Sequence, residues 1–301
     1  MFKTIIFTLL GALTLSVSAQ TTNARAVVTD RDGKSREIYV ITASEKAILY
    51  LANARSTSQE TMLRRSVDSI FFYRPSSYQK ALEAYNSGKF SVAAAGFKAC
   101  KEEYIKTKLL PQNYSSRAAF YELECARRQG KYDELATLLD EFRPDSLVNE
   151  NYITQLEIYP FWEAVGKKQW KRIKQISPSW DKKKLPGFQR AQVAYCVGLA
   201  LKEMGELDEA LMRFNEALAL SELKEIELVQ NSAEMAIEVI LADEAVQACE
   251  KSQSTSKPDQ GSRAYLNLLE AVAIAKFWDG CESGRPLPTK YKKLLKYERK
   301  Q

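Results

Sequence analysis

The chain has 301 residues, 45% of them hydrophobic, and its 44 Lys and Arg outnumber its 38 Asp and Glu. A packed core is therefore expected, and the mild excess of positive charge hides a division along the chain that is described below. Histidine is absent from the whole sequence, which excludes Ser-His and Cys-His nucleophile pairs and removes the commonest general base and zinc ligand. We therefore expect no metal site and no cofactor.

The chain begins with the pattern of a cleavable secretory signal peptide over residues 1–19. Lys3 precedes an uncharged apolar run that ends in Val17-Ser18-Ala19 before Gln20. No cysteine follows the expected cleavage point, so lipid attachment is not predicted there, and no later stretch approaches the roughly 20 apolar residues that span a bilayer. We expect an exported protein without a transmembrane segment, periplasmic or extracellular. The alternative is an uncleaved amphipathic anchor.

The sequence pattern of residues 20–75 predicts a small β module. Asp30-Arg31-Asp32-Gly33 has turn chemistry, and the segments on either side of it alternate or are rich in β-branched residues, which predicts a hairpin. The expected antiparallel strands are 24–29, 36–42, 46–51, 60–63 and 69–73. A helix within 44–64 is the alternative, because Ala, Glu, Lys and Leu are common there.

After Arg74-Pro75 the pattern becomes helical, and glycine-centred hairpins recur. Gly88, Gly130, Gly166 and Gly205 each follow one amphipathic run and precede another, at intervals of 42, 36 and 39 residues. Glycine supplies the backbone freedom that ends the first helix of such a pair. The pattern predicts successive antiparallel helix pairs over residues 76–220.

The best copy runs from Tyr195 to Leu220 and reads YCVGLALKEMGELDEALMRFNEALAL. Gly198 lies in the middle of the first helix, where only a hydrogen side chain lets the second helix approach closely, and small and large residues alternate on one face of the second. The expected repeat-packing positions in all copies are Gly88, Ala93, Phe97, Gly130, Gly198, Gly205, Ala210, Phe214 and Ala217.

These hairpins resemble the tetratricopeptide repeat (TPR) family over roughly Ser77 to Leu220. The resemblance implies a mainly α fold, an α/α superhelical TPR-like solenoid, here with a small N-terminal antiparallel β element. Residues 221–301 are expected to add C-terminal helices and a basic tail. The expected segments there are helices at 222–241, 243–251 and 263–278, and a short basic helix or frayed tail at 290–300.

In that family the first helix of each pair lines the inner surface, where peptides bind. The positions of this chain that the resemblance places in such a groove are Tyr78, Tyr85, Phe120, Arg127, Arg128, Tyr195 and Lys202. Aromatic bodies with cationic tips suit an acidic or C-terminal peptide. The alternative is that Tyr78, Phe120 and Tyr195 are ordinary packing between repeats.

Five cysteines are an odd number for an exported chain. Cys100, Cys125 and Cys196 occupy apolar helical positions, so we expect buried thiols there. Cys249 and Cys281 flank the last long helical segment and could be bridged.

Charge is divided along the chain. Residues 163–190 contain nine basic and two acidic residues, and residues 203–250 contain thirteen acidic and two basic ones. Such blocks could steer an oppositely charged partner or set contacts between subunits, which makes self-association possible. The alternative is that they are solvated helix faces. Lys182-Lys183-Lys184 comes without a stacking-aromatic motif, so no nucleic-acid partner is predicted.

Together these features predict an exported, non-enzymatic scaffold or adaptor that binds proteins or peptides in the cell envelope. One alternative is that the β module binds a polymer such as a cell-wall glycan while the helices mediate self-association. A third hypothesis is a carboxylate-dependent hydrolase on an α/α scaffold. It would need two converging buried carboxylates, and the acidic pairs at 102–103, 208–209 and 243–244 read more simply as exposed charge.

Overall fold

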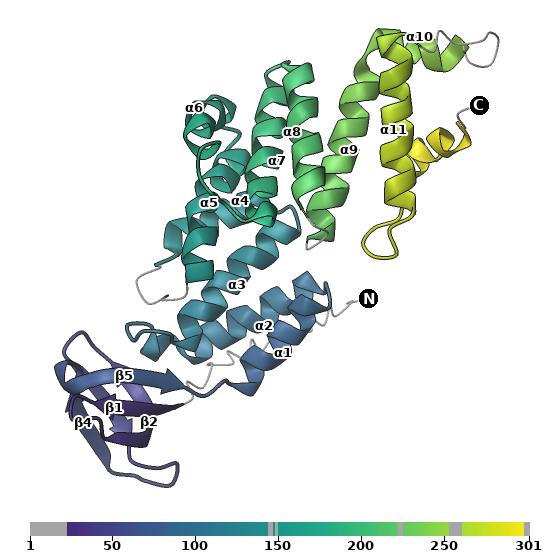
Figure 1. The fold of residues 1–301 in the computed structure, drawn as a ribbon. Coiled ribbons are helices and arrows are strands. Elements are labelled where there is room, and N and C mark those ends of the chain that lie inside the picture. The colour runs from purple at the N-terminus through teal and green to yellow at the C-terminus, as the bar shows by residue number, and fades with distance from the viewer. Residues whose placement is uncertain (1–22, 144–146, 148–149, 222–224, 253–260, 298–301) are drawn as a thin grey trace, which may run out of the picture.

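The protein folds into an N-terminal sheet followed by a curved stack of helices (Figure 1). The structure, a computed structural model, describes all residues except 1–22, 144–146, 148–149, 222–224, 253–260 and 298–301. The expected signal peptide lies outside the described residues. None of the helices in the described ranges combines the length and hydropathy that a membrane span requires. The mainly α fold with a small antiparallel β element is confirmed.

The β module is a five-stranded antiparallel sheet with the order β4-β3-β2-β1-β5. Asp30 closes the first hairpin, because its Oδ1 accepts the backbone N–H groups of Asp32 and Lys34 at 3.0 and 2.9 Å. A helix within 44–64 is wrong, since two paired strands occupy that segment. The strands are β1 (Ala24–Asp30), β2 (Ser35–Ala43), β3 (Ala47–Leu51), β4 (Gln59–Leu63) and β5 (Val67–Phe72), with a 3-10 turn, η1 (Arg64–Ser66), before β5.

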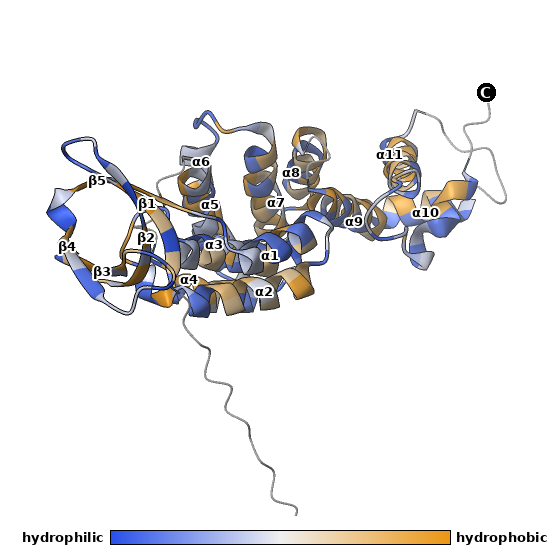
Figure 2. Cartoon of the chain, turned by 90° about the horizontal axis from the view of Figure 1, so that it is seen from below, coloured by the Kyte–Doolittle hydropathy of each residue, from blue (hydrophilic) through white to orange (hydrophobic). Residues whose placement is uncertain are grey.

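One face of this sheet packs on the first helices. The strands of the sheet curl toward one another, as the view in Figure 2 shows. Ile38, Val40 and Ile48 are fully buried on this face, and they belong to one apolar cluster with Tyr78 and Phe97 of the first two helices. A sheet this small gains stability from that shared core.

The helices form antiparallel pairs that stack side by side (Figure 1). The pairs over residues 76–220 agree with the expected hairpins, and a 3-10 helix occupies the region of the expected basic tail. The elements are α1 (Ser76–Asn86), α2 (Phe90–Glu103), η2 (Ile105–Thr107), α3 (Tyr114–Arg128), α4 (Tyr132–Glu141), α5 (Glu150–Gly166), α6 (Trp170–Trp180), α7 (Gly187–Glu203), α8 (Leu207–Leu220), α9 (Ile226–Ala242), α10 (Glu244–Ser252), α11 (Arg263–Asp279) and η4 (Thr289–Lys296).

Three of the four expected turn glycines adopt the left-handed conformation. Gly88, Gly130 and Gly205 have φ of 72°, 70° and 80°. In the third pair the left-handed residue is Lys168, with φ 53°, so the expected turn position at Gly166 is displaced by two residues. Gly166 serves close approach instead, because a Cβ atom there would lie 2.4 Å from the carbonyl oxygen of Tyr132.

The best copy packs as tightly as its sequence demands. A Cβ atom on Gly198 of α7 would lie 2.7 Å from Cε1 of Phe214 on α8, so a side chain there would force the ring or the helices to shift. Ala210, Phe214 and Ala217 are fully buried on the facing side of α8. In the first pair, Ala93 and Phe97 of α2 are likewise fully buried.

Two further features of the sequence have a structural counterpart. All five cysteines are free thiols, with Cys100, Cys125 and Cys196 buried, so the suggested bridge between Cys249 and Cys281 is not formed. The basic and acidic blocks face each other across neighbouring helices. Ion pairs join Lys174 of the basic block to Glu206 of the acidic block, and Arg190 to Glu216.

Candidate functional site

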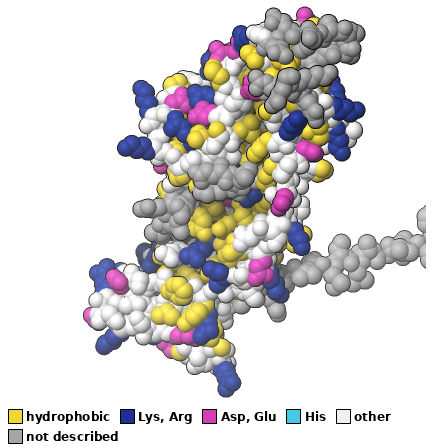
Figure 3. All heavy atoms as spheres, turned by 45° about the vertical axis from the view of Figure 1, so that its right-hand side comes forward, with side chains coloured by type: hydrophobic (Ala, Val, Ile, Leu, Met, Phe, Trp, Pro, Cys, Tyr) yellow, Lys and Arg dark blue, Asp and Glu magenta, His cyan; other side chains and the backbone are white. Residues whose placement is uncertain are grey.

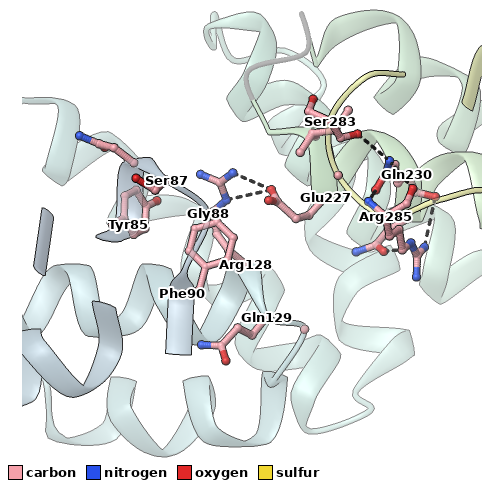
Figure 4. A pocket seen from close by; sticks show the side chains of 15 residues that line it. Tyr85, Ser87, Gly88, Phe90, Arg128, Gln129, Glu227, Gln230, Ser283 and Arg285 are labelled. Atoms are coloured by element: carbon pink, nitrogen blue, oxygen red, sulfur yellow. Dashed lines mark hydrogen bonds and ion pairs between the residues drawn. The ribbon is translucent and has the colours of Figure 1, made fainter. Parts of the chain in front are cut away.

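A cleft of about 1010 Å³ lies where the curved stack brings its two ends together (Figure 4). The turn between α1 and α2 and the end of α3 form one side, and the start of α9 and the segment after α11 form the other. We call this the central cleft. Its lining residues are Tyr85, Asn86, Ser87, Gly88, Phe90, Arg128, Gln129, Gly130, Ile226, Glu227, Gln230, Asn231, Ser283, Gly284 and Arg285.

Arg128 and Glu227 connect the two sides of the cleft. The Nε and Nη2 atoms of Arg128 donate to Oε2 of Glu227 at 3.1 and 2.6 Å. The guanidinium also lies 4.6 Å from the ring centroid of Phe90 and 5.5 Å from that of Tyr85. Burial opposes the charge on Arg128, but Tyr85 and Glu227 outweigh it and hold its pKa above the ordinary value. The side chain is therefore a fixed cation whose charge is already neutralised.

The opposite wall is shaped by Gln230, whose side-chain amide holds the segment after α11. Its Nε2 donates to the carbonyl oxygens of Ser283 and Arg285 at 3.2 and 2.9 Å, and its Oε1 accepts the N–H of Arg285 at 2.8 Å. Gly284 has φ 87°, and a Cβ atom there would lie 2.5 Å from Nε2 of Gln230. The segment is thus fixed by hydrogen bonds that only a glycine at position 284 permits.

Behind the central cleft, Arg127 is buried between two carboxylates. It donates to Glu124 at 3.0 and 2.7 Å and to Glu225 at 2.8 Å from two nitrogens. Tyr159 donates to Glu124 at 2.6 Å, and the Trp162 ring centroid lies 5.7 Å from the guanidinium. Burial opposes ionisation of Glu124, yet Arg127 and the hydrogen bonds from Arg127 and Tyr159 bring its pKa below the ordinary value. This cluster joins α3 to the residue that precedes α9, 98 positions along the chain.

Glu124 and Glu225 are two converging buried carboxylates, which is one condition of the hydrolase hypothesis. The space beside them is too small for a substrate. The cavity that borders Arg127, Trp162 and Glu225 has a volume of only about 10 Å³, room for about one water molecule and none for a substrate. Both carboxylates are committed to Arg127, and the lowered pKa of Glu124 is opposite to that of a general acid. The geometry supports a structural role for this pair.

The predicted groove residues divide between the interior and the cleft. Tyr78, Phe120 and Tyr195 are 4%, 5% and 5% exposed, so they lie in the packing between helices rather than in an open groove. Their ring centroids are 4.7 Å from Tyr114, 4.5 Å from Tyr152 and 5.9 Å from Trp162, respectively. The physical reason is that neighbours on both sides cover the large rings of the first helices.

The cationic members of the predicted groove make contacts within the chain. Lys202 donates to Glu238 of α9 at 2.7 Å, and Arg127 is buried as described above. Only Tyr85 and Arg128 of the predicted set line the central cleft. The residues that sequence reasoning missed are Gln230 and Arg285. The glycine in Ser283-Gly284-Arg285, between two helical segments, was the available signal for a fixed turn.

The lining of the central cleft can be described by the groups that it offers. Aromatic faces, side-chain amides and one internal ion pair line it, and within the described ranges no three of His, Cys, Asp or Glu converge as metal ligands. Such a lining recognises shape and hydrogen-bonding groups. Comparison of the chain with protein-family models, with curated proteins and with solved structures found no match to any of them.

Proposed function

We propose that this protein is a non-enzymatic, TPR-like scaffold that binds an extended peptide segment of a partner protein in the central cleft. The observation that carries the proposal is the cleft itself, about 1010 Å³ in volume and built from both ends of the helical stack. A ligand that spans it contacts the α1–α2 turn and α9 at once. Binding would therefore depend on the curvature of the whole stack.

The lining favours an uncharged polar segment over an acidic one. The charge of Arg128 is neutralised by Glu227, and Arg285 donates to Glu234 at 2.6 Å and to Asn231 at 3.0 Å. Side-chain amides such as Asn86 both donate and accept, as a peptide backbone does. The partly buried ring of Tyr85 adds the apolar contact on which peptide binding commonly rests.

The cellular setting of the proposal comes from the sequence alone. The pattern of residues 1–19 is typical of exported proteins. We therefore propose that the partner is a protein of the cell envelope, in the periplasm or outside the cell.

The proposal can be tested by selecting peptides from a library on the unmodified chain and then measuring their affinity for a cleft-blocking variant. Asn86→Trp places an indole in the cleft from an exposed position, and Lys80→Trp places the same indole on the exposed side of α1 outside the cleft. Peptides selected on the unmodified chain should bind Lys80→Trp normally and lose at least about tenfold in affinity for Asn86→Trp. Equal affinity for the two variants would mean that peptides do not use this cleft.

A second candidate function, polymer binding by the β module, is favoured by one array on the outer face of the sheet. Phe71 and Tyr73 are 61% and 38% exposed, with ring centroids 5.8 Å apart. Arg25 lies 4.2 Å from the Tyr73 centroid and donates to both carboxylate oxygens of Glu37 at 2.9 and 2.8 Å. Figure 3 shows hydrophobic side chains gathered beside charged ones on the surface of the β module. Exposed rings next to a neutral ion pair suit the apolar faces and hydroxyl groups of a sugar chain.

Sedimentation with an insoluble cell-wall glycan tests this second candidate. The double variant Phe71→Ala/Tyr73→Ala should stay in the supernatant, while Leu63→Ala should sediment as the unmodified chain does. Leu63 is a fair control because it is 49% exposed on β4, at the other edge of the sheet. Sedimentation of the double variant would exclude this array as a glycan site.

A further inference from the structure

A second cleft lies where the β module meets the helical stack, and the proposed function does not use it. This junction cleft has a volume of about 650 Å³, within the range of small-molecule sites. Its wall combines segments of the β module, α2, α3 and α4. The residues are Glu45, Arg64, Lys101, Ile105, Lys108, Leu109, Pro111, Ser115, Ser116, Ala119, Glu122, Leu123, Leu138, Glu141, Phe142 and Arg143.

The floor and sides of the junction cleft are apolar. Leu123 of α3 is 1% exposed and forms the base of the floor, whereas Ile105 and Leu109 are each 40% exposed and meet solvent. Leu138 and Phe142 are only partly buried against the core. Large apolar side chains that converge on a concave surface and still meet solvent gain free energy when an apolar ligand covers them.

Cations from three separate segments reach the rim. They are Arg64 of η1, Lys108 after η2 and Arg143 after α4, and in the described part of the chain none of them forms an ion pair. Among the described residues, Arg143 donates to the backbone oxygens of Asp140 and Phe142, at 3.2 and 2.9 Å.

Other charges on the wall reduce this surplus without removing it. Lys101 is neutralised by Glu122. Two carboxylates, Glu45 and Glu141, also line the cleft, so the rim keeps one net positive charge. This net charge is small, but it lies around an apolar floor, so the cleft offers a positive rim and an apolar surface to one ligand.

We infer that the junction cleft binds an anionic amphiphile, a single acyl chain with one negatively charged head group. The acyl chain would cover the floor around Leu123 and Leu109. The head group would lie at the rim, where Arg64 and Lys108 approach it from opposite modules. An amphiphile with a positive head would bring like charges together there, and an uncharged one would leave the cations without a partner.

Isothermal titration of the full chain with dodecanoate, below its micelle concentration, tests this inference. Arg64→Glu/Lys108→Glu reverses two rim charges, and Arg65→Glu/Lys106→Glu reverses two exposed neighbours that lie outside the cleft. The dissociation constant should rise about tenfold in the first double variant and stay unchanged in the second. Dodecanol should bind more weakly than dodecanoate, and dodecyltrimethylammonium more weakly still.

Three results would overturn the inference: absence of saturable binding, equal losses in the two double variants, or binding of dodecyltrimethylammonium as tight as that of dodecanoate. Ala119→Phe, which fills the floor from a half-buried position, provides a check that does not depend on charge and should also weaken binding. Circular dichroism verifies that each variant is folded. Because Asn86→Trp blocks only the central cleft, it should bind dodecanoate normally, which separates this test from that of the peptide-binding proposal.

Discussion

Arg127 and Arg128 are neighbours in the sequence and lie in opposite environments. The side chain of Arg127 is 2% exposed and held by two carboxylates, whereas that of Arg128 is 14% exposed and pairs with Glu227 at the wall of the central cleft. Both connect α3 to the beginning of α9. The difference teaches that burial, rather than charge or spacing, decides whether an arginine of this helix holds the stack together or shapes its surface.

The largest effect is expected from removing the buried arginine. Arg127→Met keeps an unbranched, flexible side chain but removes the guanidinium, and so leaves Glu124 and Glu225 buried without a cation. We expect the free energy of unfolding, measured with urea, to fall by about 3–5 kcal/mol. Arg128→Met is the matched control, and it should lose about 1 kcal/mol or less. Equal losses in the two variants would contradict the contrast drawn from burial.

A second prediction tests whether disturbing a buried contact without charge also lowers the free energy of unfolding. Gly198→Ala brings a methyl group within 2.7 Å of the Phe214 ring, and the overpacking should cost about 1–3 kcal/mol in the same urea measurement. Gly280→Ala provides the control, because its new Cβ atom would have no neighbour nearer than 3.4 Å. A Gly198→Ala variant as stable as Gly280→Ala would show that α7 and α8 adjust more readily than the contact distance implies.

The pH dependence of stability sharpens the contrast further. Burial opposes ionisation of Glu124, but Arg127 outweighs it, so its folded pKa lies below the ordinary 4.5. A carboxylate of this kind stabilises the fold above the ordinary value, and the stabilisation is lost as the pH falls through the lower folded pKa. The free energy of unfolding should therefore decline on acidification below pH 4.5. In Arg127→Met this part of the decline should be absent, and an unchanged slope would show that other carboxylates control it.

The sequence predicted local structure well because local rules determine it. Alternation and a turn at Asp30 identify the first hairpin of the sheet, and Gly88, Gly130 and Gly205 mark three helix turns because each needs a positive φ. The position of the third turn could not be predicted, because Lys168 adopts a positive φ although its residue type gives no indication of it.

The site could be predicted only in part. Whether Arg127 meets solvent or Glu225 depends on the curvature of the intervening helices, which bring together residues 98 positions apart. No local pattern encodes such a distance. The same curvature builds the central cleft, so Tyr85 and Arg128 could be chosen from sequence but Gln230 and Arg285 could not.

The smallest effect should come from exchanging the charges of the cleft pair, and it separates the two arginines most cleanly. Arg128→Glu alone should lose about 1 kcal/mol, and adding Glu227→Arg should restore most of it, because the pair lies at a partly exposed wall where the reversed pair can form again. The same exchange at the buried cluster should fail. Arg127→Glu combined with Glu225→Arg leaves the new glutamate beside Glu124, with which Arg127 makes two hydrogen bonds in the unmodified chain. Urea unfolding of both double variants checks the prediction. Recovery at both places would mean that the interior tolerates rearranged charge as the cleft does, and the distinction between the two neighbours would then disappear.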